Sequence, residues 1–461
     1  MVKFRPQRVR DPLHNLIEFR ATEFENAMWN AIETPAFQRL RRVKQLGFSD
    51  LVYPGASHSR FAHSLGVFHT ARMLMKIVKE KIGSDSFKET RADSALAAAL
   101  VHDLGHGAFS HAFEDVGKRL GWELVENHEF ATEQIILNTE LSEILKNYDI
   151  PNIVSDIKNG GKDIYGAVVS SQFDADRLDY MRRDRLMTGT NHGAIDFDWL
   201  VANLEIAHVP YGVDEKQVGN VETFVLGPKA IYAAEAYVLG LFQLYPTVYY
   251  HKTTRGAEKI FSELLFRIAS LVNDSSLNQT GLSANHPLVK YIRKPKDLKR
   301  FLDLDDTIVW GALPMLQNAN DSIIKDLSKR LFERNLYKSV NLRHRIRLER
   351  DLDYSKESSD KIDKNCAEIQ IKLADWKSNN QSQSHKILFD HVDRVPYKKF
   401  VESKGPLNQI RVKIETGDLV DLGERSEVVK AIRTFKVDRI YIPDGDDESE
   451  KIVEGMIRSK V

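Results

Sequence analysis

Apolar residues recur every three or four positions along most of the chain up to residue 272, and this spacing predicts a mainly helical protein. The longest such pattern covers residues 61–81 and predicts an amphipathic helix. Residues 92–103 are almost wholly apolar, as expected of a buried helix. Two shorter helices are expected over residues 23–45, divided at Thr34-Pro35 because proline suits a first helical turn. Further helical patterns lie at 127–146, 167–185, 196–206, 229–245 and 255–272.

The composition and the spacing of apolar residues change from about residue 340 onward. Residues 343–386 are heavily charged, and beyond them β-branched residues alternate or cluster between turn residues, a pattern typical of strands. These stretches are 386–392, 410–415 and 439–442, and strand-like stretches also occur at 1–20 and 221–226. We therefore expect a mainly α fold with two domains, a helical core over residues 1–335 and a small α+β region over residues 336–461.

Composition limits the classes of protein to consider. Basic and acidic residues number 66 each, so no net field attracts the chain to nucleic acid or to an anionic membrane. Cys366 is the single cysteine, which excludes a disulfide framework. The N-terminus lacks the apolar stretch of a signal peptide, and no apolar run approaches the ~20 residues of a membrane helix. We expect a soluble, cytoplasmic protein without a membrane partner and without nucleic acid as its principal partner.

The adjacent pair His102-Asp103 ends the apolar stretch and is the strongest chemical signal in the chain. An imidazole nitrogen and a carboxylate oxygen from consecutive residues can hold one divalent cation. His63 and an aspartate from a third segment could complete a mixed nitrogen and oxygen site suited to iron, manganese, magnesium or zinc. Asp174 and Asp176 compete for this last position, and spacing alone does not choose between them. A buried charge needs a partner or a metal, and nothing basic close in sequence would neutralise Asp103. The pattern therefore points to a metal-dependent phosphohydrolase.

Further histidines follow the pair. His106 lies four residues after His102 and shares its helical face if the helix continues that far. His111 follows within the same ten residues. So many metal-competent side chains in so short a stretch favour a catalytic site over hydrogen-bonded structural histidines. The structural interpretation is preferred for His14, His58 and His69.

A second group of polar residues falls at helical spacing. Asp176, Tyr180 and Asp184 occupy positions i, i+4 and i+8, so they form one stripe of a helix, and Arg177 flanks it. A solvated charged face is the alternative. Apolar neighbours argue that the helix is partly buried and that its polar stripe lines a site; they are Phe173, Leu178 and Met181. Arg60, three residues before His63, carries a guanidinium suited to bidentate phosphate contact, although a surface arginine at a helix start is an equal alternative.

The stretches that carry these residues resemble the HD-domain superfamily, and more narrowly its deoxynucleoside triphosphate (dNTP) triphosphohydrolases. The similar stretches are 11–14, 34–41, 44–47, 54–66, 102–111 and 174–184. They span residues ~5 to ~190, with the HD motif region at 50–190, and the C-terminal region resembles the small α+β tail of bacterial members. The resemblance thus implies an HD-domain helical core over residues 1–335.

The resemblance also implies roles for individual residues. The implied metal ligands are His63, His102, Asp103 and Asp176, which favours Asp176 over Asp174. The implied catalytic residues are His106, His111, Glu114 and His128. The implied substrate contacts are Gln45, Leu46, Arg60, Arg177, Tyr180 and Asp184. Glu33, Gln38 and Arg41 fall where the resemblance places residues that read an activating nucleotide between subunits. The chain departs from the mammalian members of this family at three positions. Glu114 replaces an aspartate, Thr247 replaces a phosphate-binding arginine, and Arg255 replaces a sugar-packing tyrosine.

The expected activity is the hydrolysis of a dNTP to a deoxynucleoside and tripolyphosphate, with a divalent metal (Mn, Mg, Fe or Zn) as cofactor, in a homo-oligomer, dimer or tetramer. One alternative is another HD phosphohydrolase activity, either a cyclic-nucleotide phosphodiesterase or a nucleotide monophosphatase. The G-Y-P signature of cyclic-dinucleotide enzymes is absent. A second alternative is a sensor that binds nucleotide or nucleic acid without catalysis, against which the complete ligand set argues.

Overall fold

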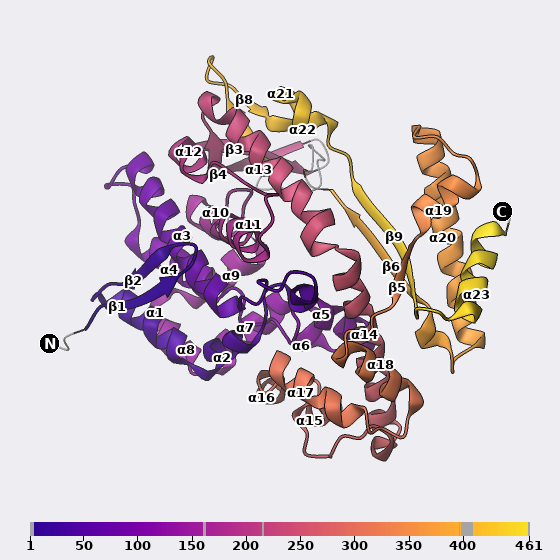
Figure 1. Cartoon of the computed structure of the whole chain (residues 1–461). Helices are drawn as coiled ribbons and strands as arrows, with labels where there is room; N and C mark the ends of the chain where they lie inside the picture. The colour runs from indigo at the N-terminus through magenta and orange to yellow at the C-terminus, as the bar shows by residue number, and fades with distance from the viewer. Residues whose placement is uncertain (1–3, 160–162, 214–215, 396, 398–408, 460–461) are drawn as a thin grey trace. The chain divides into compact units, whose positions relative to one another are not determined.

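The chain is mainly helical, as the sequence predicts, in a computed structural model that describes residues 4–159, 163–213, 216–395, 397 and 409–459 (Figure 1). It forms two compact units. The first comprises Met1–Val248, Phe301–Asp306 and Pro396–Arg433, and the second comprises Tyr249–Arg300, Thr307–Val395 and Thr434–Val461. These limits differ from the expected division between residues 335 and 336. That division concerns the end of the catalytic core and stays a prediction.

The first unit contains most of the helices and two small sheets. Its elements before the central helices are β1 (Gln7–Asp11), β2 (Asn15–Phe19), α1 (Glu23–Glu33), α2 (Pro35–Arg39) and the 3-10 turns η1 (Leu40–Arg42) and η2 (Gly47–Leu51). There follow α3 (Arg60–Ile82), α4 (Glu89–Val101), α5 (His111–Leu120), α6 (Glu123–Glu126), α7 (His128–Asn138), α8 (Leu141–Leu145), η3 (Lys146–Tyr148), α9 (Ile150–Asn159), α10 (Ile164–Val169), α11 (Ala175–Thr188) and α12 (Phe197–Ala202). The unit continues with β3 (Leu204–Val213), β4 (Lys216–Leu226), η4 (Pro228–Ala230), α13 (Ile231–Leu244), β7 (Arg411–Lys413), β8 (Leu419–Asp421), α21 (Leu422–Arg425) and α22 (Glu427–Ala431).

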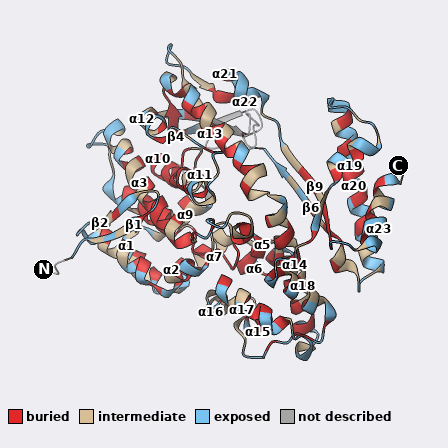
Figure 2. Ribbon diagram, in the orientation of Figure 1, coloured by how far each residue is buried: buried red, intermediate tan, exposed pale blue. Residues whose placement is uncertain are grey.

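Helices α3, α4 and α11 form the part of this unit that carries the site. The helix expected over residues 61–81 is α3, whose side chains are mostly buried and whose first turn is capped by the Ser59 hydroxyl (Figure 2). The apolar stretch 92–103 forms α4, which packs against α3, α9 and α10. Its many alanines present little side-chain bulk, so three helices can approach it closely.

Gly66 sets the distance between α3 and α11. A Cβ atom at this position would lie 2.1 Å from Oδ1 of Asp179 and 2.3 Å from an Arg183 guanidinium nitrogen. Glycine is therefore needed here for close approach rather than for an unusual backbone conformation. The buried ion pair of α11 occupies the space that a larger residue would fill.

The second unit is built from helices and a three-stranded antiparallel sheet ordered β5-β9-β6. Its elements are α14 (Lys252–Asn273), η6 (Leu277–Gln279), α15 (Pro287–Arg293), α18 (Ser322–Phe332), β5 (Lys338–Asn341), α19 (Leu342–Glu349), α20 (Lys356–Asn379), η7 (Ser384–Lys386), β6 (Leu388–Arg394), β9 (Phe435–Ile442) and α23 (Asp447–Arg458). Two more helices, α16 (Leu298–Leu302) and α17 (Asp306–Leu316), begin or end in the stretch that belongs to the first unit. No helix of the described residues is long and apolar enough to cross a membrane.

Several expectations need correction. The helix expected over residues 127–146 is divided into α7 and α8, and the one expected over residues 196–206 ends at Ala202, before β3 begins at Leu204. Residues 167–185 form two helices, α10 and α11, because Asp174 caps a new helix by accepting hydrogen bonds from the amides of Arg177 and Ser171. The strands expected after residue 386 do not share one sheet. Strand β7 pairs in parallel with β4, so β3, β4, β7 and β8 form a sheet of the first unit. Alternation identifies a strand, but it does not identify the strand's partner.

The close approach at Gly66 gives a prediction about stability. Gly66→Ala should lower the free energy of unfolding by about 3 kcal/mol, because overpacking is combined with displacement of a buried ion pair. Urea denaturation measures the change. The matched control is Gly311→Ala in α17, where an added Cβ meets nothing within 4 Å, so this variant should be unchanged or slightly stabilised. Equal stability of the two variants would contradict the packing argument.

Candidate metal and catalytic site

Three elements bring four of the expected residues together. His63 comes from α3, His102 from the end of α4, Asp103 from the turn that follows, and Asp176 from the first turn of α11. Nε2 of His63 lies 2.9 Å from Oδ1 of Asp176 and 3.7 Å from Oδ2 of Asp103. Nε2 of His102 lies 3.7 Å from the same Asp176 oxygen and 3.3 Å from Asp103. These separations suit ligands that share one cation at bonds of about 2.0–2.2 Å.

The ring orientations favour a metal. Nδ1 of His63 lies 2.9 Å from Oδ2 of Asp179, and Nδ1 of His102 lies 3.0 Å from the carbonyl oxygen of Ala99. Metal-binding histidines are commonly oriented by such a second hydrogen bond, which leaves Nε2 for the ion. Nε2 of His102 is buried and has no hydrogen-bond partner among the described residues. The donor set, two imidazoles and two carboxylates, thus fits a divalent cation.

The electrostatics of this group depend on compensation of buried charge. Burial favours a neutral Asp103, but Arg60, together with His102 and His106, holds the pKa of this carboxyl well below its usual range. Arg60 donates from a terminal guanidinium nitrogen to Oδ2 of Asp103 at 2.6 Å. No basic residue close in sequence neutralises Asp103, as expected, but Arg60 does so from helix α3. The compensating charge is 43 residues away in sequence and adjacent in the fold.

The choice between the two aspartates follows from capping. Both Asp174 oxygens accept backbone amides at the start of α11, so this side chain is committed to the helix terminus. Asp176, two residues later, lies beside His63 and His102. Of the two aspartates, Asp176 is therefore the one close to both imidazoles.

A second group adjoins the first and contains His106, His111, Glu114 and His128. Oε1 of Glu114 lies 2.8 Å from Nδ1 of His128, 3.2 Å from Nδ1 of His111 and 3.4 Å from Nδ1 of His106. Burial opposes ionisation of Glu114, yet the hydrogen bonds from His111 and His128 hold its pKa well below the usual range. The rings of His106 and His128 stack with centroids 3.9 Å apart. Burial, together with Arg60 and His128, lowers the pKa of His106 well below its usual range.

His106 reaches this group by a route that differs from the expected one. Helix α4 ends at Val101, so His106 does not continue the helical face of His102. It stands in the loop of residues 104–110, hereafter the HD loop, and its Nε2 lies 3.3 Å from Oδ1 of Asp103. Gly105 permits this path, because a Cβ there would lie 2.0 Å from the carbonyl oxygen of His128. His106 therefore lies between the two groups.

The expected sugar-contact residues are connected through His58. The backbone N–H of Gln45 donates to the carbonyl oxygen of His58, and Nε2 of His58 lies 2.8 Å from Oδ1 of Asp184. Oε1 of Gln45 is buried and without a hydrogen-bond partner among the described residues. Leu46 follows as the residue before η2, and Tyr180 lies between Asp176 and Asp184 on α11. Burial raises the pKa of Tyr180 well above its usual range, so its phenol stays neutral.

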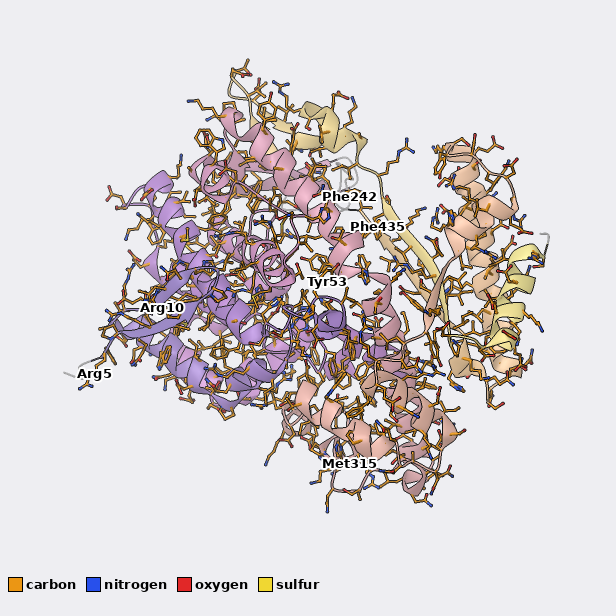
Figure 3. The ribbon with its side chains drawn as sticks, viewed as in Figure 1. Arg5, Arg10, Tyr53, Phe242, Met315 and Phe435 are labelled. Carbon is orange, nitrogen blue, oxygen red and sulfur yellow. The ribbon has the colours of Figure 1, made fainter. Side chains whose placement is uncertain are left out.

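The expected phosphate-contact arginines are both engaged with the protein. Arg60 is buried, and Arg177 donates to the carbonyl of Ser171 and lies 3.4 Å from Asp174. Thr247 lies in a π-helical turn at Tyr245–Tyr249, and its hydroxyl donates to the carbonyl oxygen of Gln243. Its own carbonyl oxygen accepts a hydrogen bond from the hydroxyl of Tyr53, which is labelled in Figure 3. Arg255 belongs to the second unit and pairs there with Asp390 and Glu258.

The three residues expected to read an activating nucleotide occupy a break between helices. Glu33 ends α1 and is exposed, Gln38 lies in α2, and Arg41 lies in η1. Nε of Arg41 donates to Oε1 of Gln38 at 2.8 Å, and its guanidinium lies 3.6 Å from the centroid of the Phe61 ring. Thr34, which separates α1 from α2, supplies the bend that the sequence requires near Pro35.

Sequence reasoning missed the residues that support His63. Asp179 is fully buried and accepts from His14, His63 and Arg183, and Arg183 in turn pairs with Asp11. A signal was present, since Asp179 and Arg183 are spaced i, i+4 on a partly apolar helix. The structural role preferred for His14 agrees with this arrangement.

The chain is similar to known proteins in sequence. The sequence matches the HD domain over residues 60–181. The uncharacterized protein YwfO of Bacillus subtilis is 32% identical over 341 residues, which cover 72% of this chain and 71% of that protein. The mouse deoxynucleoside triphosphate triphosphohydrolase SAMHD1 is 27% identical over 408 residues, which cover 79% of this chain and 59% of the mouse protein.

Two crystal structures are similar to the chain in fold. A phosphohydrolase from Bacteroides thetaiotaomicron gives a TM-score of 0.71 at 23% identity, with 95% of this chain and all of that chain covered. A hypothetical protein from Aquifex aeolicus gives 0.67 at 25% identity, with 98% of this chain covered. These likenesses establish the fold.

The ligand geometry gives a prediction about metal content. His102→Ala and Asp103→Ala should each remove the bound divalent cation while the fold survives, because each deletes one donor from a group of four. Elemental analysis of the purified variants, with circular dichroism as the check on folding, measures this. The control is His69→Ala, a histidine outside the four donors whose ring lies tilted against that of His14, with centroids 4.8 Å apart. Unchanged metal in both ligand variants would refute the assignment.

Proposed function

The chain belongs to the HD-domain family, and we propose that it is a metal-dependent triphosphohydrolase that converts a dNTP to a deoxynucleoside and tripolyphosphate. The observation that carries the proposal is the adjacency of the two groups. The candidate metal donors lie beside a carboxylate with three imidazoles, one of which, His106, lies 3.3 Å from Asp103. A hydrolase of phosphate esters needs these two functions side by side, one to stabilise charge and one to move a proton.

The relatives support the same substrate class. SAMHD1 proteins of mouse and cattle, whose name states dNTP triphosphohydrolase activity, are 27% and 28% identical to this chain. HD-domain hydrolases hold a divalent cation, and here His63, His102, Asp103 and Asp176 would hold it. When bound, it supplies charge stabilisation for a phosphate and lowers the pKa of water. Its identity, among Mn, Mg, Fe and Zn, is left to elemental analysis.

The reaction makes a proton donor necessary. Water adds to the α-phosphorus, the bond from phosphorus to the 5′ oxygen breaks, and the departing alkoxide needs a proton. An alkoxide is a poor leaving group compared with pyrophosphate, so the site must protonate it selectively. We assign this step to His111, because its Nδ1 faces Glu114 and its ring is 69% exposed. His106 suits the role less well, since its side chain is buried.

The remaining groups bind and orient the substrate. Arg60 and Arg177 carry the positive charge nearest the candidate ligands and would balance the triphosphate. Their contacts with Asp103 and Asp174 would be shared with or exchanged for phosphate oxygens. Gln45 and Asp184 would hold the 3′-hydroxyl, while Leu46 and Tyr180 pack against the sugar. His128, bonded to Glu114, would orient the proton donor.

The first test is product analysis with the purified protein. With Mn²⁺ or Mg²⁺, dNTPs should yield deoxynucleoside and tripolyphosphate, and His111→Ala should slow turnover by ~10²–10⁴ with metal content unchanged. Chromatography separates these products from the monophosphates that a pyrophosphatase would release. Hydrolysis of cyclic nucleotides or nucleoside monophosphates in place of dNTPs would reassign the activity within the family, and binding without turnover would indicate a sensor.

The same assay tests the sugar contacts. A site that pairs a hydroxyl can reject an analogue lacking it by up to ~10⁴, whereas exclusion of an added hydroxyl by apolar groups gives only about 10². The 3′-deoxy analogue of dGTP should therefore lose more kcat/KM than GTP does. Equal kcat/KM for dGTP and its 3′-deoxy analogue would remove Gln45 and Asp184 from this role.

We further propose that Glu33, Gln38 and Arg41 bind an activating guanine nucleotide between subunits. A carboxylate accepts from the N1 and N2 edge of guanine, and an arginine donates to O6 or N7. The hydrogen bond from Arg41 to Gln38 holds both side chains in one place. Binding at this surface would favour a dimer or tetramer.

This regulatory proposal has a direct test. Kinetics in substrate should be sigmoidal, mass in light scattering should rise with nucleotide, and Arg41→Ala should abolish both effects with the metal retained. Arg42→Ala is the control, because the next arginine pairs with Asp305 instead. Hyperbolic kinetics with every dNTP and a constant mass would leave a constitutive enzyme.

A further inference from the structure

A carboxylate from a distant part of the chain touches the HD loop. Asp306 is 5% exposed and stands at the start of α17. Its Oδ1 accepts the Phe109 amide at 2.6 Å, and its Oδ2 accepts the Lys44 amide at 2.9 Å. One rigid carboxylate thus sets the distance between two segments that precede it by roughly 200 residues or more.

The part of the HD loop held in this way has an uncommon backbone. Phe109 and Ser110 have φ angles of +55° and +56°, a region that residues other than glycine rarely adopt. Two such residues in succession persist only where the surroundings fix them. Asp306 supplies a fixed acceptor to the first of them.

A continuous set of hydrogen bonds leads from this point to the candidate ligands. The hydroxyl of Ser110 donates to the carbonyl of Lys44 and accepts from Nε of Arg60, each at 2.8 Å. Arg60 donates in turn to Asp103. A shift of Phe109 or Lys44 would therefore move the guanidinium that balances Asp103.

Arg39 holds the other side of the HD loop. Its guanidinium is 1% exposed and donates to the carbonyl oxygens of Leu104 at 2.9 Å and His106 at 2.7 Å. It also donates to the carbonyl of Leu304 at 2.9 Å and lies over the Phe301 ring. Leu304 and Asp306 belong to the same short stretch, Phe301–Asp306, which the first unit takes from the middle of the chain.

We propose that Leu304, through Arg39, and Asp306, through Phe109, clamp the HD loop and that Asp306 is a positioning residue for the reaction. Asp306 fixes Phe109 and Lys44, and through them sets Ser110 and Arg60 against Asp103. This inference rests on the proposed function, because it names what holds the geometry of that site. Asp306 is not one of the candidate metal ligands and acts through the amides of Phe109 and Lys44.

The neighbouring residue provides a matched control. Asp305 is also a buried carboxylate, but it pairs at 2.5 Å with Arg42, whose side chain is 49% exposed. Asp305→Asn removes a carboxylate charge one residue from Asp306 and leaves the hydrogen bonds of Asp306 to the Phe109 and Lys44 amides in place. It should behave as the wild type in all the measurements below.

The experiment compares Asp306→Ala, Asp306→Asn and Asp305→Asn in the full chain loaded with Mn²⁺. Asp306→Ala should lower kcat for dNTP by about 10- to 100-fold with KM within about twofold, as expected when a distant change misplaces reacting groups. Asp306→Asn should fall between it and the wild type, since its amide oxygen accepts only one of the two amides. Metal content should stay that of the wild type.

Hydrogen exchange gives a readout that does not depend on activity. Amides of residues 104–110 should exchange faster in Asp306→Ala, while peptides of α3 remain protected. Unchanged exchange there, or a kcat equal to the wild type, would overturn the proposal. If Asp306→Ala does not unfold cooperatively, Asp306→Asn decides by the same criteria. If the wild type hydrolyses no dNTP, the proposed function fails, and exchange in the HD loop still judges the clamp.

Discussion

Asp179 is the buried carboxylate on which the arrangement of the site depends. It accepts hydrogen bonds from Arg183 on α11, from His14 between β1 and β2, and from His63 on α3. Removal of one partner from such a buried pair costs about 3–5 kcal/mol, because the remaining charge is left uncompensated. The orientation of His63, and hence the direction of its Nε2, follows from the position of Asp179. A residue outside the expected site therefore determines how a candidate metal ligand is presented.

The same principle of compensated burial extends through the first unit. Asp103 is balanced by Arg60, Asp11 and Asp179 are balanced by Arg183, and Asp156 is balanced by Arg91. These pairs leave few ways for the helices to shift relative to one another without stranding a charge. Rigid placement of charge suits electrostatic catalysis, in which groups must be aimed before the reaction begins. It also explains why glycine stands at position 66, where a side chain would displace the pair of Asp179 and Arg183.

The sequence predicted local features well and long-range partners poorly. The amphipathic spacing of residues 61–81, the break at Thr34 and the strand at 221–226 each appear as expected, because they depend on neighbours within a few positions. The resemblance also placed His63, the pair His102-Asp103 and Asp176 in three separate segments, which the fold brings together. The sequence analysis missed the ion pair of Asp103 with Arg60 and the hydrogen bonds that Asp179 and Asp306 accept. A single sequence does not show which distant residues come into contact. The break at Asp174 was missed for a different reason, namely that a capping aspartate lies within an otherwise helical pattern.

The parallel pairing of β7 with β4 has a consequence for the order of folding. Strand β4 ends at Leu226, and its partner begins at Arg411, so the sheet of the first unit stays incomplete until nearly the whole chain has been synthesised. Until then the end of β4 at Leu226 lacks its partner in β7, and unpaired strand edges attract other strands. A nascent or truncated chain that contains the complete set of candidate ligands would therefore still carry an open sheet edge. The ability to hold the metal and the ability to avoid aggregation are thus encoded at opposite ends of the same polypeptide.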